Sequence, residues 1–381
     1  MQNKTFEKRF SERNAFWIVG VFFVFSLHIF LYFKIRAIFG EAIITSLWMF
    51  WGAFFSALPL ITRKTKRIKS KKQLKWSDRV GSVYTLYIFI VSVILLFLDF
   101  IDLFIPINLS SGEIFLFSLA LALIFIVFGI KQANTIQTTF LKVPTQKLPV
   151  ESTNLRVVQL TDLHLGPWVG TLLLEQIVDK INKAEPDIIV VTGDLTDGSL
   201  DNREDELEIL RKMKAPLGIF AVTGNHDYYD SIDSAIAFME SAGMKVLKTE
   251  SIEVGGIIIA GVNDIDHLLK SKWGLSRSES LILSLERVQK EKFLLLLRHR
   301  PIIELGTEGH FDLQLSGHTH GGQLFPLFSS RHIIVGCNRG CKKLKCGGLL
   351  YVNNGAGFVG PPFRFMAPPE IAVIDIVKEE A

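Results

Sequence analysis

The sequence has few cysteines, and they are not arranged as a disulfide framework. Cys337, Cys341 and Cys346 are the only three in 381 residues, and they lie close together. An odd number of clustered cysteines does not form a set of bridges, so we expect free thiols in a reducing compartment. Three ligands at this spacing also match no common zinc pattern. The sequence therefore assigns these thiols no role.

The second part of the chain lacks the positive charge that nucleic-acid binding requires. Residues 151–381 carry 24 Lys and Arg against 31 Asp and Glu, whereas residues 1–150 carry 18 against 7. The net charge of +4 thus hides a basic first part and an acidic second part. Because an acidic domain repels phosphate backbones, we exclude a nucleic-acid partner. The sequence also shows no internal repeat and no low-complexity segment.

Long apolar runs are abundant before residue 131. Hydrophobic residues make up 49% of the chain, and four runs of them cover residues 15–33, 42–61, 83–105 and 114–130. Each has about the ~20 residues that a helix needs to cross ~30 Å of hydrocarbon. The first run is too long for a signal peptide and has no small-residue cleavage site after it. We predict an all-α transmembrane anchor of four helices over residues 1–131. Because the runs hold few polar groups, we prefer an anchor to a transporter or channel.

The basic residues between these runs predict the orientation of the anchor. Nine Lys and Arg lie from Arg63 to Arg79 in the Thr62–Ser82 loop, whereas the Pro106–Glu113 loop has none. Positive-inside bias therefore places that basic loop and both termini in the cytoplasm, with the chain crossing the inner membrane several times. Lys34 and Arg36, which fall in a short outer loop, oppose this orientation.

Residues 132–151 are polar and contain Pro144 and Pro149, so we predict a linker there. Beyond it, short apolar runs alternate with the helical stretches Leu172–Ala184 and Arg203–Met213. This alternation predicts an α/β domain over residues 152–381. The expected strands are Leu155–Leu160, Asp187–Val191, Gly218–Val222, Gly256–Ala260, Phe293–Leu297, Leu313–Ser316, Leu349–Val352 and Ile371–Ile376.

Five short motifs each follow one of these expected strands. They are Asp162-Leu-His164, Gly193-Asp194-Leu-Thr-Asp197, Gly224-Asn225-His226-Asp227, His299 before Pro301, and Gly317-His318-Thr-His320. Strand ends of an open α/β sheet are where sites form. Residues i and i+2 of an extended segment point the same way. We therefore expect Asp162 and His164 to bind one ion together, and His318 and His320 to face one site.

The ordered set resembles the calcineurin-like metallophosphoesterase family over about residues 154–376. The resemblance implies a four-layer sandwich, with two β-sheets flanked by helices, and two divalent metal ions. It implies that one ion is held by Asp162, His164, Asp194 and His320, and the other by Asn225, His299 and His318, with Asp194 bridging both. Carboxylate, imidazole and carbonyl ligands together suit Mn²⁺, our first expectation, and also Fe or Zn²⁺.

The same resemblance makes His226 the acid that protonates the leaving group, or a donor to the phosphate, with Asp197 orienting its ring. Two ions ~3.5–4 Å apart would activate a bridging hydroxide for in-line attack on phosphorus. Arg364 lies between prolines, where its guanidinium could hold a substrate phosphate bidentately. Arg298 and Arg300 flank His299, and the alternation of an extended chain turns both away from it. We expect neither of them to contact substrate.

The membrane helices before the domain resemble those of a membrane-associated bacterial branch of the family, as do Gly321-Gly322-Gln323 and Pro361-Pro-Phe-Arg364. Some members of that branch resemble hydrolases of UDP-2,3-diacylglucosamine in lipid A synthesis. We therefore expect a metal-dependent phosphoesterase or pyrophosphatase that acts on a lipid-linked substrate at the bilayer. The alternatives are a phosphodiesterase or phosphatase for soluble substrates and a non-catalytic membrane sensor. A sensor would show a lost ligand, and this sequence has lost none.

Overall fold

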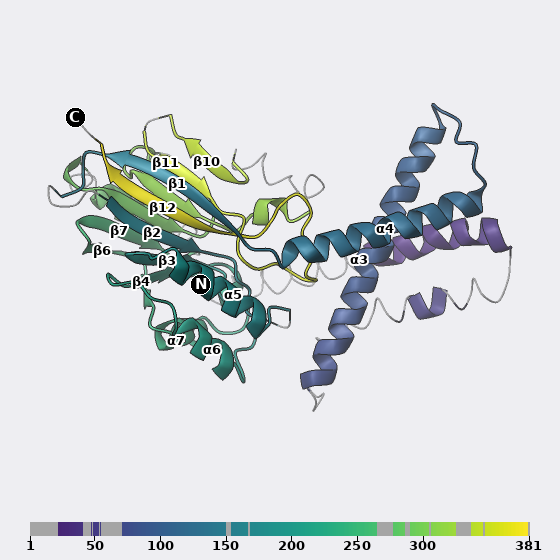
Figure 1. The fold of residues 1–381 in the computed structure, drawn as a ribbon, viewed down its shortest axis with the longest axis horizontal. Coiled ribbons are helices and arrows are strands. Elements are labelled where there is room, and N and C mark those ends of the chain that lie inside the picture. Colours follow the sequence, from purple (N-terminus) through teal and green to yellow (C-terminus); the bar gives the residue numbers. More distant parts are fainter. Residues whose placement is uncertain are drawn as a thin grey trace. The chain divides into compact units, whose positions relative to one another are not determined.

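The computed structural model describes residues 22–40, 47, 49–52, 54, 71–149, 154–166, 168–264, 277–285, 290–304, 306–324, 337–345 and 347–379. The chain forms two compact units, Met1–Phe128 and Gly129–Ala381 (Figure 1). Cys337 is buried and Cys341 is exposed, and both are free thiols, while Cys346 lies outside the described residues.

Three stretches of helix in the described part of the chain are long and apolar enough to cross a membrane: Phe22–Phe39, Arg79–Asp102 and Ser111–Ala133. They correspond to three of the four predicted spans. The predicted span 42–61 lies largely outside the described residues, as do residues 15–21 of the first prediction.

The third predicted span belongs to a longer helix than the apolar run indicated. Helix α3 covers Lys71–Asp102, so it begins inside the predicted Thr62–Ser82 loop. Lys, Gln and Leu at its start are good helix formers, and they extend the helix beyond the apolar run. Helix α4 covers Ser111–Ala133, three residues more than predicted at each end. Ser110 and Glu113 form a capping box at its start, in which the Glu113 carboxylate accepts from the Ser110 N–H at 2.7 Å.

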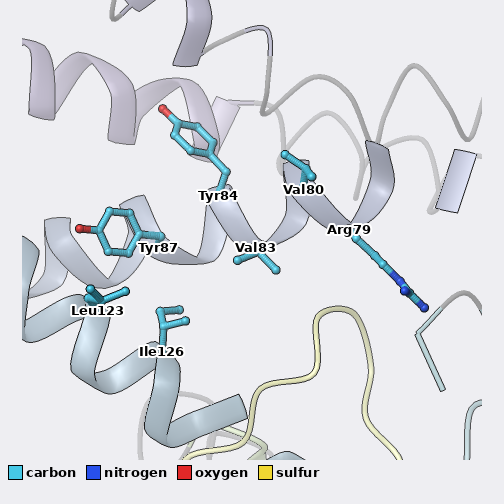
Figure 2. Close-up of a pocket in the computed structure, with 7 residues that line it drawn as sticks. All are labelled: Arg79, Val80, Val83, Tyr84, Tyr87, Leu123 and Ile126. Carbon is cyan, nitrogen blue, oxygen red and sulfur yellow. The ribbon is translucent and has the colours of Figure 1, made fainter. Parts of the chain in front are cut away.

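Several polar groups in the described part of this unit are paired. Lys34 Nζ contacts Asp99 Oδ1 at 2.6 Å. The carboxylate thereby offsets the positive charge of Lys34, which opposed the predicted orientation of the anchor. His28 is buried, and its Nε2 lies 3.3 Å from the Tyr84 hydroxyl. A hollow of about 570 Å³ lies between α3 and α4. Figure 2 shows its lining, in which Arg79, Val80, Val83, Tyr84 and Tyr87 come from α3, and Leu123 and Ile126 from α4.

The described residues of the second unit form two six-stranded sheets. The first has the order β1-β12-β2-β3-β4-β5, and the second has the order β10-β11-β9-β8-β7-β6. Strands β2 to β5 are parallel, and so are β7, β8, β9 and β11. The strands are β1 (Gln137–Thr145), β2 (Asn154–Leu160), β3 (Ile188–Thr192), β4 (Ile219–Val222), β5 (Lys245–Val246), β6 (Glu250–Val254), β7 (Ile257–Val262), β8 (Leu294–Arg298), β9 (Leu313–Ser316), β10 (Gly340–Lys343), β11 (Leu349–Val352) and β12 (Glu370–Lys378).

Apolar side chains divide this unit into four layers. Val157 and Ile188 of the first sheet pack with Leu295 of the second in the core between the sheets. The outer face of the first sheet carries α5 (Thr171–Lys183), α6 (Glu204–Leu210) and α7 (Ile232–Ser241), which lie together in Figure 1. The outer face of the second sheet packs against Ile282 of α8 (Arg277–Ser284). Because strands such as β3 are covered on both faces, they read as continuous apolar runs.

Strand β1 covers nine residues of the segment 132–151 that was predicted to be a linker, so this part of the segment belongs to a sheet instead. It pairs in parallel with β12 over its full length, and Pro144 stands opposite Val377. A proline fits here because β1 is an edge strand, whose outward N–H groups need no partner strand. The two properties that suggested a loop, proline and exposed polar residues, are also those of an edge strand. The catalytic unit therefore includes residues well before 152.

Candidate active site

All five motifs lie just after the carboxyl ends of parallel strands. Asp162 and His164 follow β2, Asp194 follows β3, Asn225 and His226 follow β4, His299 follows β8, and His318 and His320 follow β9. Carboxyl ends of parallel strands meet at one edge of a sheet. The two sheets thus bring side chains that are far apart in sequence into one buried cluster, in which Asp162 and His299 have no exposed surface.

The backbone at this cluster is not extended, which corrects one expectation. Asp162, His164, Asp194 and His320 have φ between 51° and 52°, and His318 has φ 73°. Few residues other than glycine adopt this left-handed conformation, which costs about 1–3 kcal/mol at each position. Asp162 and His164 do converge, but tight turns after the strand direct them rather than the alternation of a strand.

One group of ligand atoms comes from Asp162, His164 and His320. The Nε2 atoms of the two histidines are 3.0 Å apart, and Asp162 Oδ1 lies 3.4 Å from His320 Nε2. Two nitrogens bound to one ion at ~2.0–2.1 Å stand roughly 3.0–3.4 Å apart. The spacing therefore fits a shared ion.

A second group comes from Asp194, His299 and His318. Asp194 Oδ2 lies 3.1 Å from His299 Nε2, which lies 3.2 Å from His318 Nδ1. His299 Nδ1 is 2.9 Å from the Thr192 carbonyl and donates to it. With Nδ1 bound in this way, Nε2 is the nitrogen that remains to bind an ion, as in metal-binding histidines generally.

The carboxylate of Asp194 faces both groups. Its Oδ2 lies 3.7 Å from His164 Nε2 and 3.1 Å from His299 Nε2. Its Oδ1 accepts from the His226 backbone N–H at 2.7 Å. One oxygen is therefore fixed by the backbone, while the other lies between the two sets of histidines.

The Asn225 side chain supplies a further test of whether ions fit. Its Oδ1 is buried and has no hydrogen-bond partner among the residues described. A buried acceptor without a donor is costly, and a cation in the site would satisfy it. With this carbonyl, two carboxylates and four imidazoles, the site presents ligands that suit Mn²⁺, Fe or Zn²⁺.

Burial and charge perturb the titration of these groups. Burial raises the pKa of Asp162 to about 6. Burial lowers the pKa of His164 to about 4, so its ring is neutral and able to bind a metal at pH 7. Burial also opposes the charged form of His299, but the neighbouring Asp194 carboxylate raises the pKa of that imidazole to about 10. The two buried carboxylates thus attract positive charge into the site.

His226 stands beside both groups and has its own carboxylate partner. Its Nδ1 lies 3.0 Å from Asp197 Oδ1. Burial lowers the pKa of His226, but the hydrogen bond to Asp197 and the charges of Asp194 and Asp197 together outweigh it, so the pKa is raised. Ligand atoms of His164, Asp194 and His226 also lie within 4.8 Å of one another. The geometry thus permits both a protonated acid and a ligand at this position.

Sequence comparisons relate this chain to known proteins. The family model of calcineurin-like phosphoesterases matches residues 155–322. A metallophosphoesterase of Aquifex aeolicus is 35% identical over 248 residues, which cover 63% of this chain and 94% of that one. A metallophosphoesterase of Campylobacter jejuni is 32% identical over 71% of each chain. In Danio rerio, a transmembrane protein with a metallophosphoesterase domain is 31% identical over 69% of this chain and 62% of its own. The chain belongs to the calcineurin-like metallophosphoesterase family.

In this metallophosphoesterase, Arg364 is not available to substrate, which corrects the role expected for it. The side chain is fully buried. Its Nη2 lies 3.1 Å from His320 Nδ1, and the guanidinium donates to the backbone carbonyls of His320, Asn354, Gly355, Gly357 and Ala367. Burial lowers its pKa to about 10, so the guanidinium stays charged at neutral pH. Arg364 therefore holds the backbone around one candidate ligand.

Asp227 is a site residue whose role the sequence did not reveal. Its buried carboxylate accepts from the N–H groups of Asp194 at 3.0 Å, Gly224 at 2.8 Å and Thr196 at 2.9 Å. It thereby fixes the loops after β3 and β4 to each other. The available signal was its place in the Gly224–Asp227 motif, immediately after the histidine.

The glycines of the metallophosphoesterase motifs are needed for close approach. A Cβ at Gly317 would stand 2.0 Å from Asp162 Oδ2, and one at Gly224 would stand 2.2 Å from Asp194 Oδ1. Real Cβ atoms do not come this close to other heavy atoms. A side chain at either glycine would therefore displace a carboxylate of the site.

Proposed function

We propose that this metallophosphoesterase binds two divalent ions, with Asp194 as the ligand common to both. Asp162, His164 and His320 complete one site, and Asn225, His299 and His318 complete the other. The observation that carries the proposal is the position of Asp194 Oδ2 between His164 Nε2 and His299 Nε2, at 3.7 and 3.1 Å. Mn²⁺ is the first ion to test, followed by Fe and Zn²⁺.

The reaction is hydrolysis of a phosphoester or pyrophosphate. Bound ions would supply Lewis acidity and lower the pKa of the attacking water. The water oxygen bonds to phosphorus, and the bond from phosphorus to the leaving oxygen breaks. His226 gives the leaving oxygen its proton, and the proton lost by water restores the imidazolium. Asp197, 3.0 Å from Nδ1, fixes the tautomer and ring position that this transfer needs.

The substrate we propose is an amphiphile in the cytoplasmic leaflet, with UDP-2,3-diacylglucosamine as the first compound to test. Three candidate membrane helices in the described chain support this, because an anchor concentrates the enzyme where a lipid-linked phosphate lies. The Lys34–Asp99 contact also weakens the charge argument against a cytoplasmic catalytic unit.

The test is hydrolysis by the full-length protein, purified with Mn²⁺ in mixed micelles. We expect kcat/KM for UDP-2,3-diacylglucosamine to exceed that for a water-soluble analogue without acyl chains. Equal values would refute the lipid substrate while leaving the phosphoesterase intact. Absence of hydrolysis of every phosphoester, bis(p-nitrophenyl) phosphate included, would refute the phosphoesterase.

A further inference from the structure

Arg300 is a partly exposed cation, fixed in place beside the ligand His299. Its Nε donates to Asp264 Oδ1 at 2.7 Å, and its Nη2 donates to Asp264 Oδ2 at 3.1 Å. The Asp264 side chain is 3% exposed, whereas that of Arg300 is 33% exposed. An arginine has five N–H donors, so three of them remain without a protein partner in the described part of the chain. The buried carboxylate thus orients a guanidinium that still has donors to offer.

The arginine on the other side of His299 has a different arrangement. Arg298 contacts both oxygens of Glu304, at 2.9 and 3.0 Å, and its side chain is 3% exposed. The Arg298–Glu304 ion pair is therefore buried, as expected of a pair with a purely structural role. Arg300 shares the bidentate geometry but not the burial, so a ligand can reach it, contrary to the expectation from the sequence.

Tyr229 lies on the solvent side of the proposed catalytic histidine. Its ring centroid is 4.2 Å from that of His226, and the residue is 58% exposed. The Tyr229 hydroxyl lies 3.5 Å from Asn225 Nδ2. Tyr229 therefore borders Asn225, which we propose binds the same ion as His299, the residue directly before Arg300.

We propose that Arg300 and Tyr229 form a subsite for the second phosphoryl group of a pyrophosphate diester, such as that of a nucleoside diphosphate sugar. The proposal rests on the proposed hydrolysis, because it places the first phosphoryl group at the metal ligands. A planar guanidinium matches two phosphate oxygens better than a lysine does. The exposed Tyr229 ring offers a flat face to the group attached to that phosphate, and aromatic rings readily stack on nucleobases.

The subsite predicts which substrates depend on it. A pyrophosphate diester carries an anionic group beyond the scissile bond, whereas bis(p-nitrophenyl) phosphate has one phosphorus only. Losing a charge-assisted bidentate contact should weaken binding about 10- to 100-fold. The effect should therefore appear in KM for the pyrophosphate and be absent for the simple diester.

The variants are Arg300→Lys, which keeps a cation beside Asp264 but loses the planar fork, and Tyr229→Leu. Arg211→Lys, an exposed arginine in the turn after α6, is the matched control. The full-length protein is assayed with UDP-glucose and with bis(p-nitrophenyl) phosphate, and the metal content of each variant is measured. We expect Arg300→Lys to raise KM for UDP-glucose about 10- to 100-fold. Its kcat, its metal content and its kinetics on the diester should stay near those of wild type, as in the control.

The outcomes separate the two proposals. If wild type cleaves the diester but not UDP-glucose, or if Arg300→Lys affects both substrates alike or neither, the subsite is refuted and the phosphoesterase stands. Loss of metal in Arg300→Lys would show that the Arg300–Asp264 ion pair supports the metal site instead of binding substrate, and this result also refutes the subsite. If wild type cleaves neither substrate, the proposed hydrolysis itself fails.

Discussion

Arg364 Nη2 lies 3.1 Å from Nδ1 of His320, and Nη1 of the same side chain donates to the His320 backbone carbonyl at 3.2 Å. The main chain of one candidate ligand is thus held by a buried cation that also contacts its ring. Such a cation is tolerated only because carbonyl oxygens surround it. The residue predicted to bind substrate is instead part of the support for the metal site.

Replacing Arg364 by Met should therefore damage both folding and metal binding. Several buried carbonyls would lose their donor, and each unsatisfied acceptor costs about 1–3 kcal/mol. We expect a markedly lower unfolding temperature in detergent and reduced metal content by mass spectrometry. Arg364→Lys keeps the charge but cannot reach all acceptors. Its unfolding temperature and metal content should therefore lie between those of wild type and Arg364→Met. Wild-type stability and metal content in Arg364→Met would contradict this role.

Replacing Asp194 by Ala should remove most bound metal and nearly all activity, because it removes the ligand that faces both groups. Metal content and turnover are measured on the same preparation. Asp205→Ala, at an exposed position of α6, is the control and should behave as wild type. Two ions and near-normal turnover in Asp194→Ala would refute a shared carboxylate.

Replacing His226 by Ala should leave metal content unchanged and lower kcat by ~10²–10⁴, the usual contribution of a general acid. The loss should be largest for substrates with a poor, alkyl leaving group and smallest for p-nitrophenolate, which needs no proton. A series of leaving groups of different pKa measures this dependence. Loss of metal would make His226 a ligand, and an equal loss for all leaving groups would exclude the acid role.

A reporter fused after residue 150 should lie in the cytoplasm. Alkaline phosphatase at that position should be inactive, because the enzyme needs the periplasm to form its disulfides. The matched fusion within the Pro106–Glu113 loop should be active, since that loop carries no basic residue. High activity of the first fusion would overturn the predicted orientation.

The strands next to the site could be predicted from the sequence because burial on both faces leaves an unbroken apolar run. In β3 and β8 every residue is buried, and both were predicted to within one residue. Strand β1 could not be recognised, since only Val143 and Thr145 of its nine residues are buried. Its partner β12 is distant in sequence, so nothing local marks the pairing.

The candidate ligands could be recognised because each motif follows an apolar strand, but their conformation could not. Left-handed backbone at His164 and His320 depends on contacts with neighbouring loops, which a local pattern does not contain. The burial of Arg364 could not be predicted either, since a sequence does not show whether the side chain of an arginine between prolines points into the core. The Arg300–Asp264 ion pair could not be predicted either, because the two residues are 36 positions apart in the sequence.

The position of β12 has a consequence for biosynthesis. Although it is the last strand in the chain, it lies between β1 and β2 in the first sheet and pairs with both. During translation, the apolar helices and most strands leave the ribosome before Glu370–Lys378 does. The first sheet therefore stays divided until these residues arrive, with β1 separated from β2. Insertion of the apolar helices can thus precede completion of the first sheet.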